Sequence, residues 1–426
     1  MHDSVPARIG RRTALAGAVG ASISTAITAP AAASGPTFAI AGAAVFDGRR
    51  SLGPGAVVVR GARILAVGPE TSLPRGIDIV DGRGKTVLPG LIDAHVHAFG
   101  LDADPVRFGV TTELDMFAFL DRLGPYREQR ESTAPTRFSD LWTAGTLLTV
   151  PGGHGTEYGP IPTVAPDAGR AEIARFVGAR LAEGSDYIKV IKDDGTLFGG
   201  RTPTLSDRQV GYAIEAAHAR GARCVVHVVQ QRDALTALEA GADGLAHVPA
   251  DPMPPEVVEL ARRSGAFVTA TLSVFNALSC AGEADRVLRD PSLAPYLSQR
   301  QRDGLSARYR CKPGLFAAAR DNVRALHAAG VPILAGTDVP NSGTARGVSV
   351  LSELGLLVDA GMSPLEALRS ATGLPAQRFG LEGRGVLEPG ARADLLLADG
   401  DPTSDINAIR DIAAIWRNGR RVDRAA

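Results

Sequence analysis

The sequence is poor in cysteine and carries no excess charge of either sign. It has three cysteines among 426 residues, and none lies in a CxxC pair or near a histidine at zinc-finger spacing, so they are not predicted metal ligands. The 46 basic residues balance the 46 acidic residues, which gives no indication of a nucleic-acid or anionic-membrane partner. The motif GxSxG of serine hydrolases is also absent from the sequence.

Residues 1–35 differ in composition from the rest of the chain. Arg11 and Arg12 precede a run of small and apolar residues without an acid, which ends near Ala31 to Ser34. This order is typical of a secretory signal peptide, and the paired arginines resemble a twin-arginine signal. We therefore expect export to the periplasm or the cell exterior; an ordinary secretory signal and a disordered tail are the alternatives. The run is too rich in Gly, Ala, Ser and Thr to predict a membrane span, and no cysteine follows it to carry a lipid.

Both ends of the remaining chain carry short strand-like runs separated by turns. Val, Ile and Ala alternate with polar residues between Gly and Asp turns from residue 37 to 92, and similar runs return after Gly380. We predict that the two ends pack together as one small β domain, formed by residues 36–89 and 376–426.

The middle of the chain, residues 90–375, alternates short apolar strands with amphipathic helices. This alternation predicts an α/β fold of the (β/α)8 barrel type. In such a barrel the chemistry collects at the carboxyl ends of the strands, so ligands should lie there. The eight expected strands are 91–99, 110–117, 141–150, 186–191, 223–228, 244–248, 267–272 and 332–338.

The stretch TVLPGLIDAHVHAFG, residues 86–100, contains a His-x-His pair. Side chains at i and i+2 of a strand point to the same face, so His95 and His97 would aim at one point, as two ligands of one metal ion do. Taken alone, the pair has an ordinary alternative, namely two histidines on a polar strand edge.

Further metal-binding side chains belong to later predicted strands. His227 ends the fifth, His247 the sixth and Asp338 the eighth, and Lys189 lies in the fourth. Each of them alone is as well explained as a core histidine or a capping aspartate. Together they would converge on one mouth of the barrel, and histidine with carboxylate suits zinc and similar divalent metals.

This set of motifs resembles the amidohydrolase superfamily. The matching pieces are PGLIDAHVH, YIKV, VHV, AHV, GTDVP and EPGARADLLLADGDP, in that order. The resemblance implies a distorted (β/α)8 TIM barrel with a small β-sandwich domain built from both chain ends. It also implies two divalent metal ions, with zinc expected, of which the first takes His95, His97 and Asp338 and the second takes His227 and His247.

In the two-metal members of this superfamily a lysine carboxylated by CO2 bridges the metals, and Lys189 matches its position. An ammonium group has only hydrogen-bond donors and cannot ligate a metal. A neutral amine can take up CO2, and burial beside cations favours the neutral form. Lys192 is the competitor; in a strand it would point to the other side, and it fits a solvated strand-end lysine better.

The segment PGGHGTEYG, residues 151–159, follows the third predicted strand. Glycine-rich loops allow the backbone to approach a ligand closely. The resemblance to Xaa-Pro dipeptidases and acyl-amino-acid hydrolases of the superfamily is strongest here. His154 and Tyr158 are therefore candidates to hold a substrate carbonyl or carboxylate, and a turn-forming surface loop is the alternative.

The predicted function is hydrolysis of an amide or peptide-like C–N bond by a metal-bridging hydroxide. Two divalent ions lower the pKa of water, and Asp338 can pass a proton to the leaving group, with His154 as a second catalytic candidate. The alternatives are a lactonase, a phosphotriester or ester hydrolase on the same centre, and a non-catalytic binding protein. We expect a small-molecule substrate, no nucleic-acid partner and no stable membrane anchor, and keep both a monomer and a homo-oligomer open.

Cys280 and Cys311 flank a long excursion after the seventh predicted strand, residues 276–313. The excursion is either a lid over the barrel mouth or a decoration of it. After export the two cysteines would form a disulfide, or they remain free apolar side chains, since sequence does not show their separation. Cys224, in a buried strand, should stay a thiol.

Overall fold

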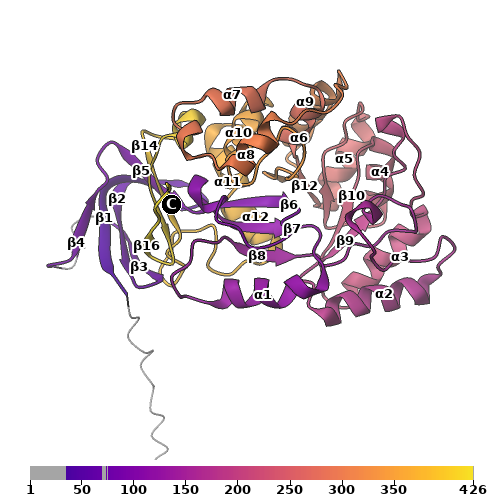
Figure 1. Cartoon of the computed structure of the whole chain (residues 1–426), viewed down its shortest axis with the longest axis horizontal. Coiled ribbons are helices and arrows are strands. Elements are labelled where there is room, and N and C mark those ends of the chain that lie inside the picture. The colour runs from indigo at the N-terminus through magenta and orange to yellow at the C-terminus, as the bar shows by residue number, and fades with distance from the viewer. Residues whose placement is uncertain (1–34, 70–72, 74, 426) are drawn as a thin grey trace, which may run out of the picture. The chain divides into compact units, whose positions relative to one another are not determined.

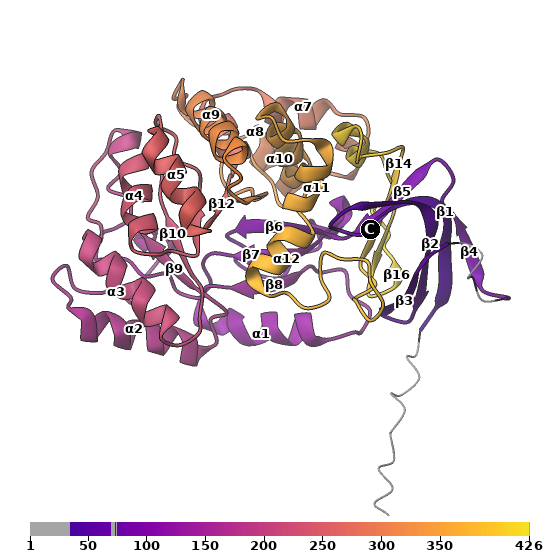
Figure 2. The same ribbon diagram turned by 180° about the vertical axis from the view of Figure 1, so that it is seen from behind.

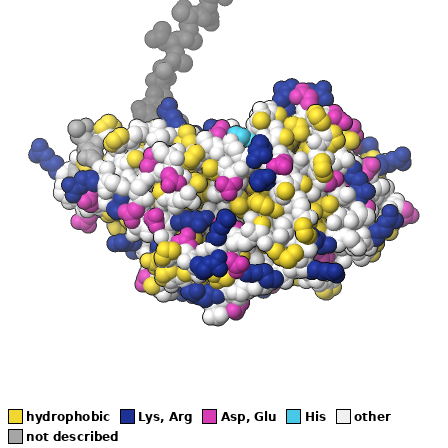
Figure 3. Space-filling view, turned by 90° about the horizontal axis from the view of Figure 1, so that it is seen from above, with side chains coloured by type: hydrophobic (Ala, Val, Ile, Leu, Met, Phe, Trp, Pro, Cys, Tyr) yellow, Lys and Arg dark blue, Asp and Glu magenta, His cyan; other side chains and the backbone are white. Residues whose placement is uncertain are grey.

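A computed structural model describes residues 35–69, 73 and 75–425. The predicted signal segment, residues 1–35, therefore lies almost entirely outside the described residues. Among the described helices, none is long and apolar enough to cross a membrane. On the face drawn in Figure 3, Lys and Arg side chains are interspersed with Asp and Glu side chains, so the two signs of charge offset each other locally.

Strands from both chain ends pair in one eight-stranded sheet (Figure 1). The C-terminal strand β14 (Leu395–Asp399) runs antiparallel to β5 (Lys85–Pro89), which in turn pairs with β1 (Thr37–Phe46). The two ends thus pack together as predicted, and the described strands form one continuous sheet. The other members are β2 (Ser51–Arg60), β3 (Arg63–Gly68), β4 (Asp78–Asp81), β15 (Ile412–Arg417) and β16 (Arg420–Arg421).

Eight parallel strands follow at the places where the sequence predicts them, and all of them are shorter than predicted. They form a three-stranded sheet and a five-stranded sheet, and both views show the first three strands side by side (Figures 1 and 2). The first sheet contains β6 (Leu91–Val96), β7 (Val110–Asp115) and β8 (Asp140–Thr143). The second contains β9 (Ile188–Ile191), β10 (Cys224–His227), β11 (Gly244–Ala246), β12 (Phe267–Thr269) and β13 (Ile333–Leu334).

The described residues do not form the continuous ladder of a closed barrel. Between the two sheets there are isolated parallel bridges, from Leu148 to Val190 and from Val96 to Val339, together with single backbone hydrogen bonds such as that from Ala94 to Ala335 over 2.9 Å. The backbone leaves the extended conformation after β8, at Gly145 (φ 61°), and after β13, at Asp338 (φ 55°). Left-handed residues cannot continue a strand, so the strand of β8 cannot extend past Gly145 to its predicted end.

Helices accompany the parallel strands. The sequence sets their ends by local signals: Ser206 and Gln209 form a capping box at the start of α3. Figures 1 and 2 both show α1 alongside β8. The helices are α1 (Leu120–Glu131), α2 (Arg170–Glu183), α3 (Asp207–His218), α4 (Gln231–Glu239), α5 (Pro255–Ser264), α6 (Leu272–Leu278), α7 (Glu283–Arg289), α8 (Gln299–Ser306), α9 (Leu315–Ala328), α10 (Val348–Asp359), α11 (Pro364–Ser370) and α12 (Gly373–Phe379).

A buried network of arginines and carboxylates joins β8 to the C-terminal strands. Arg417 of β15 is fully buried and donates hydrogen bonds to Asp394, over 2.7 Å, and to Asp140 of β8. Arg384 also pairs with Asp140, over 2.7 Å. A buried carboxylate is tolerated only when it is paired, so these contacts fix the two parts of the chain to each other.

Candidate metal centre

β6 and the turn after β13 bring three predicted ligands together. Nε2 of His95 lies 3.2 Å from Oδ1 of Asp338, and Nε2 of His97 lies 3.3 Å from the same oxygen. The three ligand atoms all lie within 4.8 Å of one another. The two histidines of the His-x-His pair therefore face one point, as the period of a strand predicts.

The local backbone explains this close approach. A Cβ atom on Gly336 would lie 2.9 Å from the backbone nitrogen of His95, so only glycine allows the chain after β13 to run this close to β6. The backbone nitrogen of Asp338 then donates to the carbonyl of His95 over 2.8 Å. Asp338 has a φ of 55°, a conformation that is costly for residues other than glycine and clusters at functional sites.

His227 and His247 lie beside this group. The ring centroid of His247 is 4.5 Å from that of His95 and 4.7 Å from that of His227. His227 is the last residue of β10, and His247, with a φ of 74°, directly follows β11. Nδ1 of His247 lies 2.8 Å from Oγ1 of Thr271, which orients the ring and leaves Nε2 as the nitrogen for a metal.

Burial keeps these histidines neutral. Burial, followed by the nearby Lys189 ammonium, lowers the pKa of His95 to about 3. Burial lowers the pKa of His227 to about 4 and that of His247 well below its ordinary value. Neutral imidazole is the form that binds metals, so these rings are in the protonation state that a metal requires.

Lys189 is buried in β9, and burial lowers the pKa of its amine to about 7. Its Nζ has no hydrogen-bond partner among the described residues. Lys192 differs, because its Nζ donates to the carbonyl of Leu205 over 2.9 Å and pairs with Asp207 over 2.8 Å. The expectation that Lys192 is solvated is wrong, since it is 8% exposed and tied to the chain before α3.

A cavity of about 210 Å³ adjoins the histidine cluster. Its polar wall includes candidate ligands, and its other wall is apolar, which is the usual composition of a site that orients a small molecule. The polar lining residues are His154, Asp193, His227, His247, Tyr309, Asp338 and Asn341, and the apolar ones are Phe198, Val229, Val274, Phe275 and Leu278.

The two residues predicted from the glycine-rich segment lie in different places. His154 lines the cavity, and its ring centroid is 4.7 Å from that of His227. Although burial acts in the opposite direction, the carboxylate of Glu157, 2.7 Å away, raises the pKa of His154. Tyr158 packs against His97 with ring centroids 5.2 Å apart, and it is not among the described residues that line this cavity.

Three polar residues of the cavity were not predicted from the sequence. Asp193 lies just after β9, with Oδ2 3.7 Å from Nε2 of His227. Its place at the carboxyl end of a parallel strand is a sequence signal that could have identified it. Asn341 donates from Nδ2 to Oδ2 of Asp338 over 2.9 Å. Tyr309 donates its hydroxyl to Oδ1 of Asn341, and no sequence pattern in the excursion points to it.

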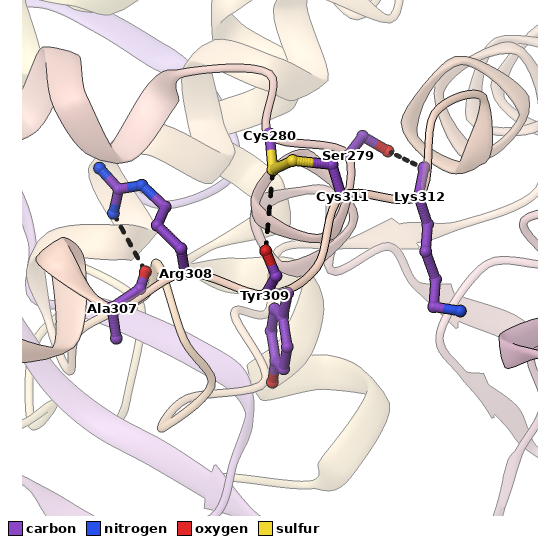
Figure 4. Close-up of a disulfide and its surroundings, with 7 residues drawn as sticks. All are labelled: Ser279, Cys280, Ala307, Arg308, Tyr309, Cys311 and Lys312. Atoms are coloured by element: carbon purple, nitrogen blue, oxygen red, sulfur yellow. Dashed lines mark hydrogen bonds between the residues drawn. A yellow bond between two sulfur atoms is a disulfide. The ribbon is translucent and has the colours of Figure 1, made fainter.

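The excursion that carries Tyr309 is closed by a disulfide. Cys280 and Cys311 are bonded, with Cα atoms 5.5 Å apart, whereas Cys224 is a buried free thiol. Figure 4 shows the side chain of Tyr309 beside the disulfide, with its ring extending away from the sulfur atoms. The backbone nitrogen of Lys312 also donates to the carbonyl of Leu278 over 2.8 Å. Two cavity-lining residues, Leu278 and Tyr309, thus lie at the closed base of this loop.

The donor set fits divalent metal ions. Several buried nitrogens of the cluster have no hydrogen-bond partner among the described residues, namely Nε2 of His95, Nε2 of His227 and Nζ of Lys189. Buried polar atoms without partners are rare and call for an explanation such as a bound ion. Imidazoles with a carboxylate form the ligand set that zinc and similar ions prefer.

Comparisons with known proteins agree with this chemistry. A family model described as the amidohydrolase family matches residues 140–422. An uncharacterized protein of Mycobacterium tuberculosis is 30% identical over 349 residues, which cover 79% of this chain and 85% of that protein. An imidazolonepropionase of Paracoccus denitrificans is 30% identical over 387 residues, which cover 81% of this chain and 88% of that protein.

A solved structure is similar as well. The crystal structure of a putative prolidase from Bifidobacterium longum superposes with a TM-score of 0.70 and 26% identity, over 91% of this chain and 94% of that one. The chain therefore belongs to the amidohydrolase family, a family of metal-dependent hydrolases that act on C–N bonds.

Proposed function

We propose that this protein is a metal-dependent hydrolase that cleaves the C–N bond of an amide-like substrate. The observation that carries the proposal is the convergence of His95, His97 and Asp338 within 4.8 Å, beside a buried lysine amine that has no partner among the described residues. In a cluster with a purely structural role, a buried amine would have a hydrogen-bond or ion-pair partner, as Lys192 has in Asp207.

The proposed ligands divide into two groups joined by Lys189. His95, His97 and Asp338 would hold one divalent ion and His227 with His247 a second, and zinc is the proposed metal. The neutral Lys189 amine would add to CO2 and release one proton, which gives a carbamate with an anionic oxygen for each ion. When bound, such ions polarise a carbonyl and lower the pKa of the attacking water.

The chain's own residues would orient the substrate and move protons. Asp338 would accept a proton from the attacking water and deliver it to the leaving nitrogen. Asn341 holds Oδ2 of this carboxylate, which fixes its orientation. His154 lines the cavity and is the proposed hydrogen-bond donor to the substrate carbonyl. Tyr158 does not line the cavity, and its proposed role is to hold the ring of His97 in place by packing against it.

The proposed reaction consumes one water molecule. The water oxygen forms a new bond to the carbonyl carbon, the C–N bond breaks, and the leaving nitrogen gains a proton. The products are a carboxylic acid and an amine.

We also propose that the protein is exported through its twin-arginine-like segment and that residues 36–89 with 376–426 act as a domain beside the catalytic residues 90–375. The disulfide between Cys280 and Cys311 supports export, because such bonds persist in oxidising compartments.

The experiment is an assay of metal-loaded protein on amides, esters, lactones and phosphotriesters, with amine release measured directly. Asp338→Asn, which keeps the side-chain volume, is the matched inactive control. Amine release that depends on metal and on Asp338 is the expected result. Turnover of lactones, esters or phosphotriesters without any amide would favour those alternatives, and metal-loaded protein without turnover would favour a binding protein.

A further inference from the structure

One wall of the cavity is apolar and comes largely from α6. Val274, Phe275 and Leu278 line it, and Val274 and Phe275 are 5% and 2% exposed, so they are held firmly by packing. The ring centroid of Phe275 lies 6.4 Å from that of His247. The apolar wall thus begins next to a candidate metal ligand, where the reacting part of a substrate would lie.

The charged side chains of the cavity wall, apart from its histidines, are carboxylates. Asp193 and Asp338 contribute them, and no lysine or arginine is present among the described lining residues. Lys312, the cation that reaches toward this region, donates its Nζ to the carbonyl of Phe198 over 2.7 Å. A substrate carboxylate placed against the apolar part of this wall, away from the proposed metal ions, would lose its hydration without gaining a cationic partner.

The size of the cavity adds a second limit. Its volume of about 210 Å³ is below the roughly 300–1,000 Å³ of sites for drug-sized ligands. The space therefore suits one aryl or branched-alkyl group next to the scissile bond.

We infer, resting on the proposed C–N hydrolysis, that the substrate is a neutral amide whose aryl or branched-alkyl group packs against α6. It is not a dipeptide or N-acyl amino acid that presents a free α-carboxylate to this wall. The same addition of water across the C–N bond then yields a carboxylic acid and an amine, at least one of which carries the apolar group.

The test uses substrate pairs that differ only in a carboxylate. N-acetyl-2-phenylethylamine is compared with N-acetyl-L-phenylalanine, and an N-acylpyrrolidine with the corresponding N-acyl-L-proline. We expect kcat/KM to be about tenfold or more higher for the neutral member of at least one pair, because the anion has no partner on the wall. Binding of all four compounds is measured separately by calorimetry, with the metal-loaded protein.

Leu278 offers a matched pair of variants. It is only partly buried and lines the cavity, so an arginine there can keep its stem on the wall and place its guanidinium at the edge of the cavity, within reach of a substrate carboxylate. Leu278→Arg should improve binding and kcat/KM for the carboxylate member relative to the neutral one. Leu278→Met has a similar length and no charge, and it should keep the preference for the neutral member.

The two proposals fail in different ways. Hydrolysis or binding of the carboxylate member as good as that of the neutral one in both pairs overturns the inference about the substrate while the proposed reaction stands. Tighter binding of the neutral member without any amine release supports the inference about the cavity and overturns the proposed reaction.

Discussion

The side-chain amide of Asn341 donates a hydrogen bond to Oδ2 of Asp338 across 2.9 Å. The other carboxylate oxygen, Oδ1, is the one that lies near both His95 and His97. Asn341 therefore fixes the rotation of the carboxylate, with Oδ1 toward the histidines and Oδ2 toward the Asn341 amide.

Replacement of Asn341 by alanine should lower kcat by about ten- to a hundredfold. A hydrogen bond to a charged group contributes roughly 1.5–3 kcal/mol, and each 1.4 kcal/mol is a factor of ten. Tyr309→Phe removes only the hydroxyl that donates to Asn341, so its loss should be smaller. Steady-state kinetics with metal analysis measures both, and unchanged kcat in Asn341→Ala at full metal content would contradict this role.

The purified protein should carry about two divalent ions per chain, and chelation should abolish activity reversibly. Because an ion that binds only the folded state stabilises it, metal removal should also lower Tm. His95→Ala should reduce the metal content in the same analysis. Protein that is free of metal but fully active would exclude the proposed centre.

Lys189→Ala should lose one ion and most activity, and short carboxylic acids should restore part of it by replacing the carbamate. Lys192→Ala is the matched control, because it removes a buried lysine of the same segment that is bonded to Leu205 and Asp207. Its effect should fall on stability and leave the metal content unchanged. The bridge assignment is wrong if the two metal contents are reversed.

Asp115 of β7 should make stability depend on pH. Burial raises its pKa from 3.8 to about 7, although the backbone nitrogen of Ala98 and the hydroxyl of Thr143 donate to it. Between these values the folded state holds a proton that the unfolded state has lost, so the free energy of unfolding falls as pH rises through the window. The shift corresponds to roughly 4 kcal/mol at most.

Asp115→Asn keeps the shape and cannot ionise. Urea unfolding of both proteins at pH values from about 4 to about 8 isolates this contribution as the difference between them. The wild-type free energy should decline relative to the variant as pH rises. Parallel profiles would show that Asp115 titrates alike in the folded and unfolded states.

The disulfide predicts one free thiol per chain under denaturing, non-reducing conditions, namely that of Cys224. Cys280 and Cys311 are 31 positions apart, and closing a loop of this length stabilises a protein by about 3–4 kcal/mol in the chain-entropy model. Cys280→Ser with Cys311→Ser should lose that amount in urea unfolding. Three reactive thiols in the wild-type protein would contradict the bond.

The parallel strands and the proposed ligands can be predicted from the sequence because both follow the regular spacing of residues along a strand. The i and i+2 spacing of His95 and His97 and the strand-end positions of His227 and His247 depend only on strand geometry. The strand predicted over residues 141–150 is too long, because the turn at Gly145 takes a left-handed conformation that apolar patterns do not reveal.

The residues that complete the cavity depend on tertiary contacts. Tyr309 reaches Asn341 because the disulfide between Cys280 and Cys311 closes the loop that carries it. Leu278 lines the same cavity although it lies 31 positions before Tyr309 in the sequence. The sequence predicts a solvated Lys192, and this prediction is wrong for the same reason, since the partner Asp207 belongs to the following helix.

The buried pairing of Asp140 with Arg384 and Arg417 has a consequence for biosynthesis. The two arginines follow Asp140 by 244 and 277 positions, so a ribosome delivers the carboxylate long before its partners. A chain that ends before Arg384 leaves this carboxylate unpaired, at a cost of about 3–5 kcal/mol if it is buried. The paired, buried state of Asp140 therefore requires residues that are translated near the end of the chain, so loss of the last β-strands should be felt at β8 as well.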